Sequence, residues 1–238
     1  MRFNLRKKDM NLFYKSLINQ AENKMAGYVV LLSYRYQNLC VKADATALMP
    51  VNIMIGGDPK NIEDVAKVGI TDEYHLVIFP NQEDLQSFII DGIFHSHPEF
   101  KLEVQSYKQN DEERHLLLYE MPEVDKNRYD ALTEGVNSLH DECKLRLDEI
   151  HAENVASVSD LFKGNPDDLD AVKKELDRVH DDYVEKTKGV RDKKLEEIEE
   201  GYQRYLEAHP EEIGAGIRNE EHGEGYNVTQ GMRMFDSE

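Results

Sequence analysis

The sequence predicts an α+β protein in which a three-helix bundle of long antiparallel helices is interrupted by an inserted small α/β domain. Three observations predict this fold class. Two long helical patterns follow one another in residues 121–209, a third lies in residues 9–42, and the segment between them consists of short apolar runs and turns.

The two C-terminal helices are predicted by apolar residues that recur at steps of three and four, which places them on one stripe of each helix. The first stripe contains Leu132, Val136, Leu139, Cys143, Leu147 and Ile150, and the second contains Leu169, Val172, Leu176, Val179, Tyr183, Val190 and Ile198. Residues 164–167, Gly-Asn-Pro-Asp, are typical of a turn between helices. Each helix then has about 40 residues and is roughly 60 Å long, too long for an ordinary compact core.

A third helix, over residues 9–42, is expected because two amphipathic helices alone leave apolar surface exposed to water. Its apolar positions repeat at helical spacing and include Leu17, Ile18, Ala21, Met25, Leu32, Tyr36, Leu39 and Cys40. Gly27 weakens this pattern without interrupting it. The bundle is therefore expected to combine residues 1–43 with residues 121–209.

The inserted domain, residues 44–120, is predicted from short apolar runs bounded by turn residues. Strands are expected at 51–55, 75–79, 102–107 and 116–119, a helix at 82–94 and a polar loop at 108–114. Gly56 and Gly57 mark a tight turn and not a phosphate-binding loop, because the lysine and the strand–turn–helix context are absent. The chain is expected to cross between the insert and the bundle at residues 43–50 and 119–123.

Acidic residues dominate the charge of the chain, with 48 Asp and Glu against 29 Lys and Arg and a formal net charge of −19. Residues 121–238 hold 31 of these acidic and 16 of these basic residues. A surface this acidic repels bare phosphate, which argues against capture of nucleic acid by simple electrostatics, and no binding of DNA is expected. The acidic segment 210–238 is predicted to be a disordered tail, whose scattered apolar residues could dock on the bundle or on a partner.

The two cysteines, Cys40 and Cys143, lie in apolar stretches and are interpreted as buried thiols in a reducing compartment. The basic N-terminus is not followed by the apolar segment of a secretory signal. The apolar run at 28–36 is too short and too polar to span a bilayer. A soluble cytoplasmic protein is expected.

Several motifs resemble those of the ribosome recycling factors, in the same order, over residues 9–208. Residues 43–49, Ala-Asp-Ala-Thr-Ala-Leu-Met, resemble that family's Gly-Arg-Ala-Ser-Pro-x-Leu-Leu segment. Residues 58–59 and 62–70 resemble its Thr-Pro-Leu-x-x-Leu-Ala-x-Val-x-Val. Arg128, Leu132 and Thr133 match a stretch containing Arg-Arg-x-x-Leu-Thr, and the helix from Pro166 to Leu195 fits without a gap.

The resemblance implies a non-enzymatic, L-shaped protein, expected to be a monomer, that needs no cofactor. Members of this family bind the ribosome after termination and, with a translocase GTPase, split its subunits for reuse. Their bundle contacts ribosomal RNA through arginines and lysines. Carried over onto this sequence, the RNA-binding candidates are Lys144, Arg146, Arg178, Lys186 and Lys193.

Four positions depart from the family pattern, since Asp44, Asp148, His151 and Ala152 stand where the family has arginine. The loss of about three phosphate contacts weakens binding through counterion release, and an aspartate facing phosphate adds repulsion. An alternative of a different class therefore stays open, namely an acidic protein–protein adaptor that kept the fold, lost ribosome recycling and binds an unknown protein partner.

Two further patterns are candidates for catalytic sites. Residues 95–98, His-Ser-His-Pro, resemble the His-x-His-Pro element of JAMM-type metalloisopeptidases, but Ser106 and Asp111 lie at the wrong separations for its zinc site, which favours surface loop histidines. His140 and Cys143 are one helical turn apart, but no third group is positioned to orient them. The sequence therefore predicts no catalytic residue and no metal site.

Overall fold

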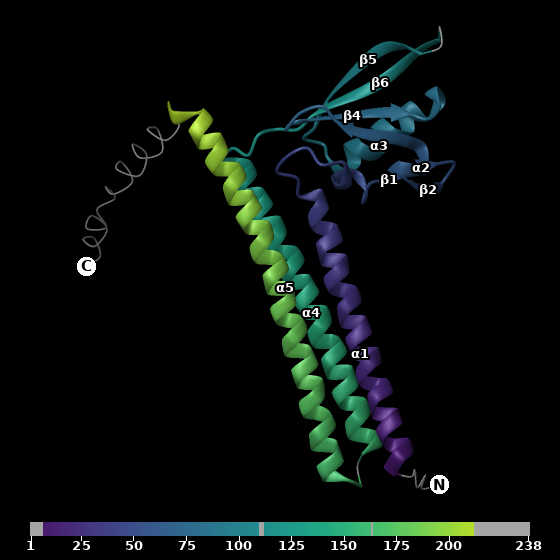
Figure 1. Ribbon diagram of the computed structural model, residues 1–238, viewed down its shortest axis with the longest axis vertical. Helices are drawn as coiled ribbons and strands as arrows, with labels where there is room; N and C mark the ends of the chain where they lie inside the picture. The colour runs from purple at the N-terminus through teal and green to yellow at the C-terminus, as the bar shows by residue number, and fades with distance from the viewer. Residues whose placement is uncertain (1–6, 110–111, 163, 212–238) are drawn as a thin grey trace, which may run out of the picture.

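Three long helices lie side by side in the computed structural model, which describes residues 7–109, 112–162 and 164–211 (Figure 1). They are α1 (Lys7–Arg35), α4 (Lys126–Leu161) and α5 (Pro166–Ala208). Each helix packs against the other two. Helices α1 and α5 start at the same end of the bundle, and α4 runs in the opposite direction. The predicted fold class is confirmed, because a bundle built from both ends of the chain carries an α/β unit at one end.

An apolar core runs along the bundle and contains residues from all three helices. The half far from the insert includes Ile18, Met25, Leu147, Leu176 and Val179, and the half near the insert includes Leu32, Tyr36, Val136, Cys143 and Ile198. The apolar stripes predicted for the three helices therefore face one another. Burial of each large aliphatic side chain contributes about 1.5–3 kcal/mol, so this packing is the main stabilising interaction of the bundle.

Local sequence signals set the beginnings of α4 and α5, which lie at opposite ends of the bundle. The Asp125 carboxylate accepts a hydrogen bond from the backbone N–H of Arg128 at 2.7 Å and caps the first turn of α4. Helix α5 begins with Pro166, which lacks an amide hydrogen where none is needed. Between the helices, the Asn165 N–H donates to the Phe162 carbonyl at 2.9 Å.

Helix α1 is shorter than predicted. It ends at Arg35 and is followed by a single 3-10 turn, η1 (Tyr36–Asn38), so the predicted end at residue 42 is wrong and Cys40 is not helical. Tertiary packing explains the difference. The buried Tyr36 donates its hydroxyl hydrogen to the Val136 carbonyl of α4 at 3.0 Å, which holds the chain as it leaves the helix. The apolar residues beyond it belong to the crossing segment.

The insert consists of two antiparallel sheets and short helices. Its strands are β1 (Asn52–Ile55), β2 (Asp58–Asn61), β3 (Ala66–Ile70), β4 (His75–Pro80), β5 (Lys101–Gln109) and β6 (Glu112–Glu120). Its helices are η2 (Ala45–Leu48), α2 (Ile62–Val65), η3 (Glu83–Leu85) and α3 (Gln86–Ser96). Strand β1 pairs with β2, and the larger sheet has the order β3-β4-β6-β5. The core of the insert includes Ile53, Leu76, Ile78, Ile89, Ile93 and Leu117.

The insert departs from the prediction in two places. Strands β5 and β6 pair as far as Gln109↔Glu112, so the polar loop predicted at 108–114 is wrong. This hairpin is largely exposed and rich in charge, which hides its strand pattern in the sequence. Strands β2 and β3 and helix α2, which have only four or five residues each, are absent from the prediction. The predicted turn is present, with φ of 62° at Gly56 and 93° at Gly57.

The predicted tail, residues 210–238, lies outside the described residues apart from its first two positions. The expected domain bounds of 1–43, 44–120 and 121–209 stay a prediction. Within the described part of the chain, no helix combines the length and the apolar character that a membrane crossing requires.

Candidate nucleic-acid interface

The five predicted RNA-binding residues are all exposed, but they do not gather on one surface. Lys144 lies on the same side of α4 as Asp148, one turn later, and Asp148 contacts His180 of α5. Lys144 therefore flanks the groove between α4 and α5. Arg146 instead lines a groove between α4 and α1, beside Tyr28.

The other three candidates lie on the side of α5 that faces α1. Arg178 lines a groove of about 550 Å³ whose opposite wall is formed by α1. Lys186 and Lys193 are seven residues apart and share one side of α5. Lys193 is also one turn before Glu197, which lines a cavity together with Ser33 of α1. These three basic residues form a row of roughly 20 Å along the helix.

Ion pairs neutralise both arginines of the candidate set. The Arg146 guanidinium lies 2.8 Å from the Glu149 carboxylate. The Arg178 guanidinium lies 2.6 Å from Glu175 and 2.7 Å from Asp182. Exposed pairs of this kind contribute little to stability, because water and salt screen them. A phosphate must nevertheless compete with a carboxylate that is already in place.

The three lysines are more available to a phosphate. The Lys186 ammonium lies over the Tyr183 ring, 3.8 Å from its centroid, in a cation–π contact. Lys144 and Lys193 have no ion pair with another residue in the described ranges. Among the five candidates, Lys186 and Lys193 therefore place two ammonium groups that have no carboxylate partner in the described ranges on the α1-facing side of α5.

Two reciprocal histidine–aspartate pairs bridge α4 and α5. The Nε2–H of His151 donates to Asp177 at 2.8 Å, and the Nε2–H of His180 donates to Asp148 at 2.8 Å. An ionised carboxylate can only accept, so each imidazole carries its proton on Nε2. The two rings lie 4.8 Å apart between centroids. A phosphate that enters this groove meets two carboxylates. The groove between α1 and α5 is also lined by the carboxylates of Glu22, Asp168 and Glu175, beside Arg178.

Arg128, at the beginning of α4, contacts both the segment that follows α1 and the segment that follows α3. Its guanidinium donates to the Cys40 carbonyl at 2.8 Å and lies 3.7 Å from the Glu99 carboxylate. Glu99 is also 3.6 Å from the imidazole of the buried His97. Burial opposes the ionisation of Glu99, but its contact with His97 and the Arg128 charge together hold its pKa below the ordinary value. The sequence assigned Arg128 no such role, and only its place in the family-like Arg-x-x-x-Leu-Thr stretch marks it out.

Both crossing segments are hydrogen-bonded to the turn between β3 and β4. The Ala43 N–H donates to the Glu73 carbonyl at 2.7 Å, and the Met121 N–H donates to the Tyr74 carbonyl at 2.8 Å. One short turn of the insert therefore holds the chain where it enters from α1 and where it leaves toward α4.

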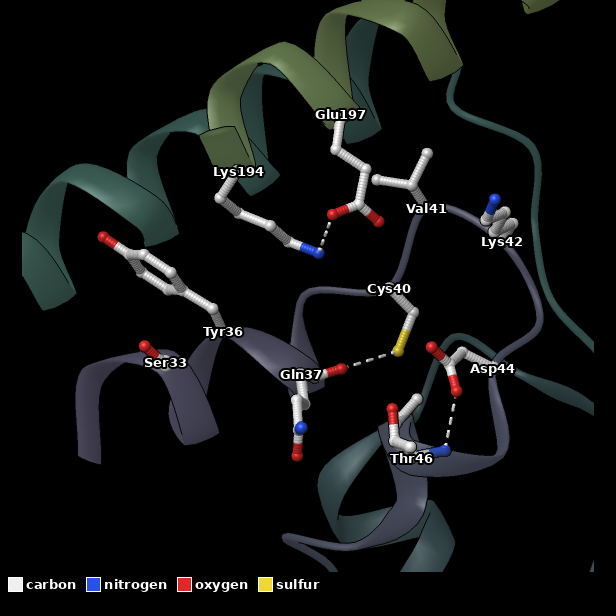
Figure 2. A pocket seen from close by; sticks show the side chains of 11 residues that line it. Ser33, Tyr36, Gln37, Cys40, Val41, Lys42, Asp44, Thr46, Lys194 and Glu197 are labelled. Atoms are coloured by element: carbon white, nitrogen blue, oxygen red, sulfur yellow. Dashed lines mark hydrogen bonds and ion pairs between the residues drawn. The ribbon is translucent and has the colours of Figure 1, made fainter. Parts of the chain in front are cut away.

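A polar cavity of about 260 Å³ lies where α1 ends beside α5 (Figure 2). On one wall, Lys194 and Glu197 of α5 pair at 2.9 Å. On the other, the Asp44 carboxylate accepts the Thr46 N–H at 2.8 Å and caps η2. Residues of the bundle and residues of the first crossing segment line this cavity together.

Gly201 of α5 is packed against both crossing segments. A Cβ at this position would overlap Val41 and would lie 3.1 Å from Val124. We expect Gly201→Ala to lower the free energy of unfolding by about 1–3 kcal/mol, because one crossing segment must be displaced. In the matched variant Gly189→Ala, the new Cβ meets nothing within 4 Å. That change should stabilise the protein by roughly 0.5–1 kcal/mol. Urea unfolding measures both, and equal effects would contradict the close contact at Gly201.

Neither cysteine has the properties of a nucleophile. Cys40 and Cys143 are free and buried, as predicted. Burial raises the pKa of the Cys40 thiol to about 12 and that of the Cys143 thiol to about 11. A catalytic thiol requires the opposite shift. His140 is itself buried and is therefore poorly placed to exchange protons with a substrate.

The two thiols make stability depend on pH in the alkaline range. Their pKa values in the folded chain, about 12 for Cys40 and about 11 for Cys143, exceed the value of about 8.5 in an unfolded chain. Their contribution is therefore complete below the unfolded pKa and is lost as pH rises toward the folded pKa. We expect the free energy of unfolding to fall between about pH 9 and pH 11, by up to about 1.4 kcal/mol per pH unit for each thiol. The double variant Cys40→Ala/Cys143→Ala should show a shallower fall in urea unfolding, and an unchanged fall would contradict this assignment.

The two histidines of the isopeptidase-like motif lie in different environments. His95 is exposed on α3, where its Nδ1 lies 2.7 Å from the Asp91 carbonyl. His97 is only 1% exposed and stacks on Phe100 with 4.5 Å between ring centroids. The interpretation of both as surface loop residues is wrong, because the chain folds inward after α3. Asp111 lies outside the described residues, and among those described no group of three His, Cys, Asp or Glu side chains is placed to hold a metal ion.

Comparison with known protein families decides which class of protein this is. The family model described as ribosome recycling factor matches residues 36–198, more than half of the 238 residues. The chain belongs to the ribosome recycling factor family. The matched region runs from the end of α1 through the insert and α4 into α5, so it includes both crossings.

A solved structure of a recycling factor has the same fold at low sequence identity. A solution structure of a ribosome recycling factor is 14% identical, has a TM-score of 0.59, and the match covers 79% of this chain and 97% of that chain. Models of the E. coli post-termination complex, with E. coli elongation factor G, contain a T. thermophilus recycling factor. It is 18% identical, has a TM-score of 0.49, and the match covers 78% of this chain and 98% of that chain. No curated protein matches the sequence.

Three of the four residues that stand at arginine positions of the family pattern have partners within this chain. Asp148 and His151 form the pairs between α4 and α5, and Asp44 caps η2. Ala152 is exposed and carries no polar group. Relative to the family pattern, positive charge on α4 has been exchanged for internally paired groups. Three of the five candidate basic residues, Arg178, Lys186 and Lys193, lie on α5, and two, Lys144 and Arg146, lie on α4.

Proposed function

We propose that this chain is a recycling-factor-like translation protein that docks on the post-termination ribosome and, with a translocase GTPase, assists subunit splitting without catalysing a reaction itself. The observation that carries the proposal is the family match over residues 36–198, which includes the insert, both crossings and the greater part of the two longest helices.

The rod-like bundle suits the mechanical part of this function. Helix α5 has 43 residues, which corresponds to about 65 Å. A helix of that length, packed on two others, can act as a lever when a partner pushes on the insert at its end. The two crossings would serve as the hinge, and the contacts of Arg128, Ala43 and Met121 would limit its range.

We further propose that ribosomal RNA is contacted mainly through the α1-facing side of α5. Arg178, Lys186 and Lys193 are spaced along it, and two of them have no carboxylate partner within the described ranges. Lys144 and Arg146 would add contacts from α4. In the groove between α4 and α5, Asp148 and Asp177 are paired with histidines, and among the candidates Lys144 alone flanks that groove.

Co-sedimentation with purified ribosomes tests the docking step. We expect the protein to pellet with ribosomes at low salt and to be released as salt rises, with a slope in log Kd of about 0.7–0.9 per phosphate contact. Failure to pellet at the lowest salt concentration would contradict the proposal.

The acidic adaptor remains the second candidate, and one observation favours it. The interhelical pairs of His151 with Asp177 and of His180 with Asp148 occupy the part of α4 where recycling factors are expected to be rich in arginine. A pull-down with the full chain that recovers a basic protein and no ribosomal subunits would support this adaptor over the recycling function.

A further inference from the structure

An exposed apolar face lies on α1 close to the insert. Val30 is 69% exposed, Leu31 45% and Tyr34 39%. Together with the exposed Gly27 they occupy helical positions i, i+3, i+4 and i+7, which form one side of the helix. We call these four residues the α1 face. Neighbouring exposed apolar side chains of this kind offer a surface on which an apolar segment can dock.

The segment that carries the α1 face differs in charge from the rest of the sequence, although its Arg35 is paired with Glu142 of α4 at 2.7 Å. Residues 23–43 contain the basic residues Lys24, Arg35 and Lys42 and no acidic residue, although the whole chain has a net charge of −19. On the neighbouring helix, Lys186 and Lys193 lie on the side of α5 that faces α1. The surface therefore suits a segment that is both apolar and acidic.

The chain has one segment of that composition, residues 212–238. It contains six acidic and two basic residues, and its second half contains Tyr226, Val228, Met232, Met234 and Phe235. The acidic residues Glu220, Glu221 and Glu224 come just before this apolar group. An occupant with matching charge is thus supplied by the protein itself.

The position where α5 ends allows this segment to reach the α1 face. Helix α5 ends at Ala208, at the insert end of the bundle, where Arg204 lies 3.4 Å from Glu73. Ser33 of α1 and Glu197 of α5 line the same cavity, so they lie at the same level of the bundle. The end of α5 is therefore only about 16 Å beyond the α1 face along the bundle. The residues between Ala208 and Tyr226 can extend over more than about 50 Å.

We propose that residues 226–235 dock on the α1 face of their own chain, with the carboxylates of residues 220–224 beside Lys186 and Lys193. Docking covers Val30, Leu31 and Tyr34 and places acidic groups beside unpaired ammonium groups. The contact is intramolecular, so it requires neither high protein concentration nor another protein.

Tryptophan fluorescence can test the docking, because the natural chain contains no tryptophan. Val30→Trp places a single reporter on the α1 face at an exposed position, where folding should be preserved. We expect its emission maximum at a shorter wavelength in the full chain than in a chain ending at residue 211. Adding a synthetic peptide of residues 212–238 to the shorter chain should restore the blue shift. The peptide with Met234→Ser and Phe235→Ser should not.

Phe94→Trp supplies the control reporter, because Phe94 is 63% exposed on α3 of the insert. Its emission should be the same in the full and the shortened chain. Equal emission of the Val30→Trp reporter in both chains would overturn the proposal. An emission shift that depends on protein concentration would also overturn the proposal, because it would indicate that a second copy of the chain binds the α1 face.

One consequence rests on the proposed function, because the docked segment would cover the side of α5 assigned to RNA. The chain ending at residue 211 should then bind ribosomes several-fold more tightly than the full chain. Fluorescence measures docking without ribosomes, so a failure of docking and a failure of ribosome binding remain distinguishable.

Discussion

Replacing Lys144, Arg146, Arg178, Lys186 and Lys193 together with glutamate should weaken ribosome binding by about three decades at low salt. Each lost charge-assisted contact is estimated at on the order of 1 kcal/mol, and five such losses correspond to a factor of 10³ or more. The salt dependence should also become shallower, because fewer counterions are released. Co-sedimentation over a range of salt concentrations measures both quantities.

The loss of ribosome affinity should differ between substitutions on α4 and substitutions on α5. The variant with Arg178, Lys186 and Lys193 changed to glutamate should lose most of the affinity, because these residues share one side of α5. Changing only Lys144 and Arg146 should cost less, since they flank different grooves.

A charge-matched control is available on the insert. There, Lys60, Lys67 and Lys101 are exposed. Changing them to glutamate alters net charge as much as the α5 variant does. An equal loss of affinity in this control would contradict the assigned RNA surface and would indicate a general effect of net charge.

Leu176→Ala should lower the free energy of unfolding by about 2–5 kcal/mol, because it leaves a cavity among all three helices. Leu176 is fully buried and shares its core cluster with Met25 of α1 and Leu147 of α4. For a chain of this size the thermal midpoint should fall by roughly 5–15 °C. Circular dichroism at 222 nm during heating and in urea measures the change.

The matched control for this variant is Leu145→Ala. Leu145 is 56% exposed on α4, so its truncation should change stability by no more than about 0.5 kcal/mol. If the two variants were equally stable, the side of α5 that carries Leu176 would not face α1 and α4, and the three-helix core would be wrong.

The long elements of this fold are predictable because each repeats its signal over many turns. Leu147, Leu176 and Val179 recur at helical spacing, and a long helix can bury such a stripe only against other helices. The end of α1 could not be predicted, because the apolar residues after Arg35 continue the same period. Only the contact of Tyr36 with Val136, a hundred residues away, shows that the chain leaves the helix there.

Short elements and the candidate interface are harder to predict, and for physical reasons. Strand β2 is four residues long and wholly exposed, so no apolar alternation reveals it. His97 is polar and yet buried, because Phe100 and the end of α3 enclose it. The sequence can list basic residues on α4 and α5, but the groove that each one lines depends on the rotation of the packed helices. The pairing of His151 with Asp177 joins residues that are unrelated in the sequence pattern.

Subunit splitting of post-termination ribosomes tests the recycling function most directly. Light scattering should fall to the level of separated subunits when this protein, the translocase GTPase and GTP are all present, and should stay high when any one is omitted. The Arg178, Lys186 and Lys193 variant should slow the fall, and the insert control should not. Scattering that stays high with all three components present, although the protein pellets with ribosomes, would contradict the recycling function.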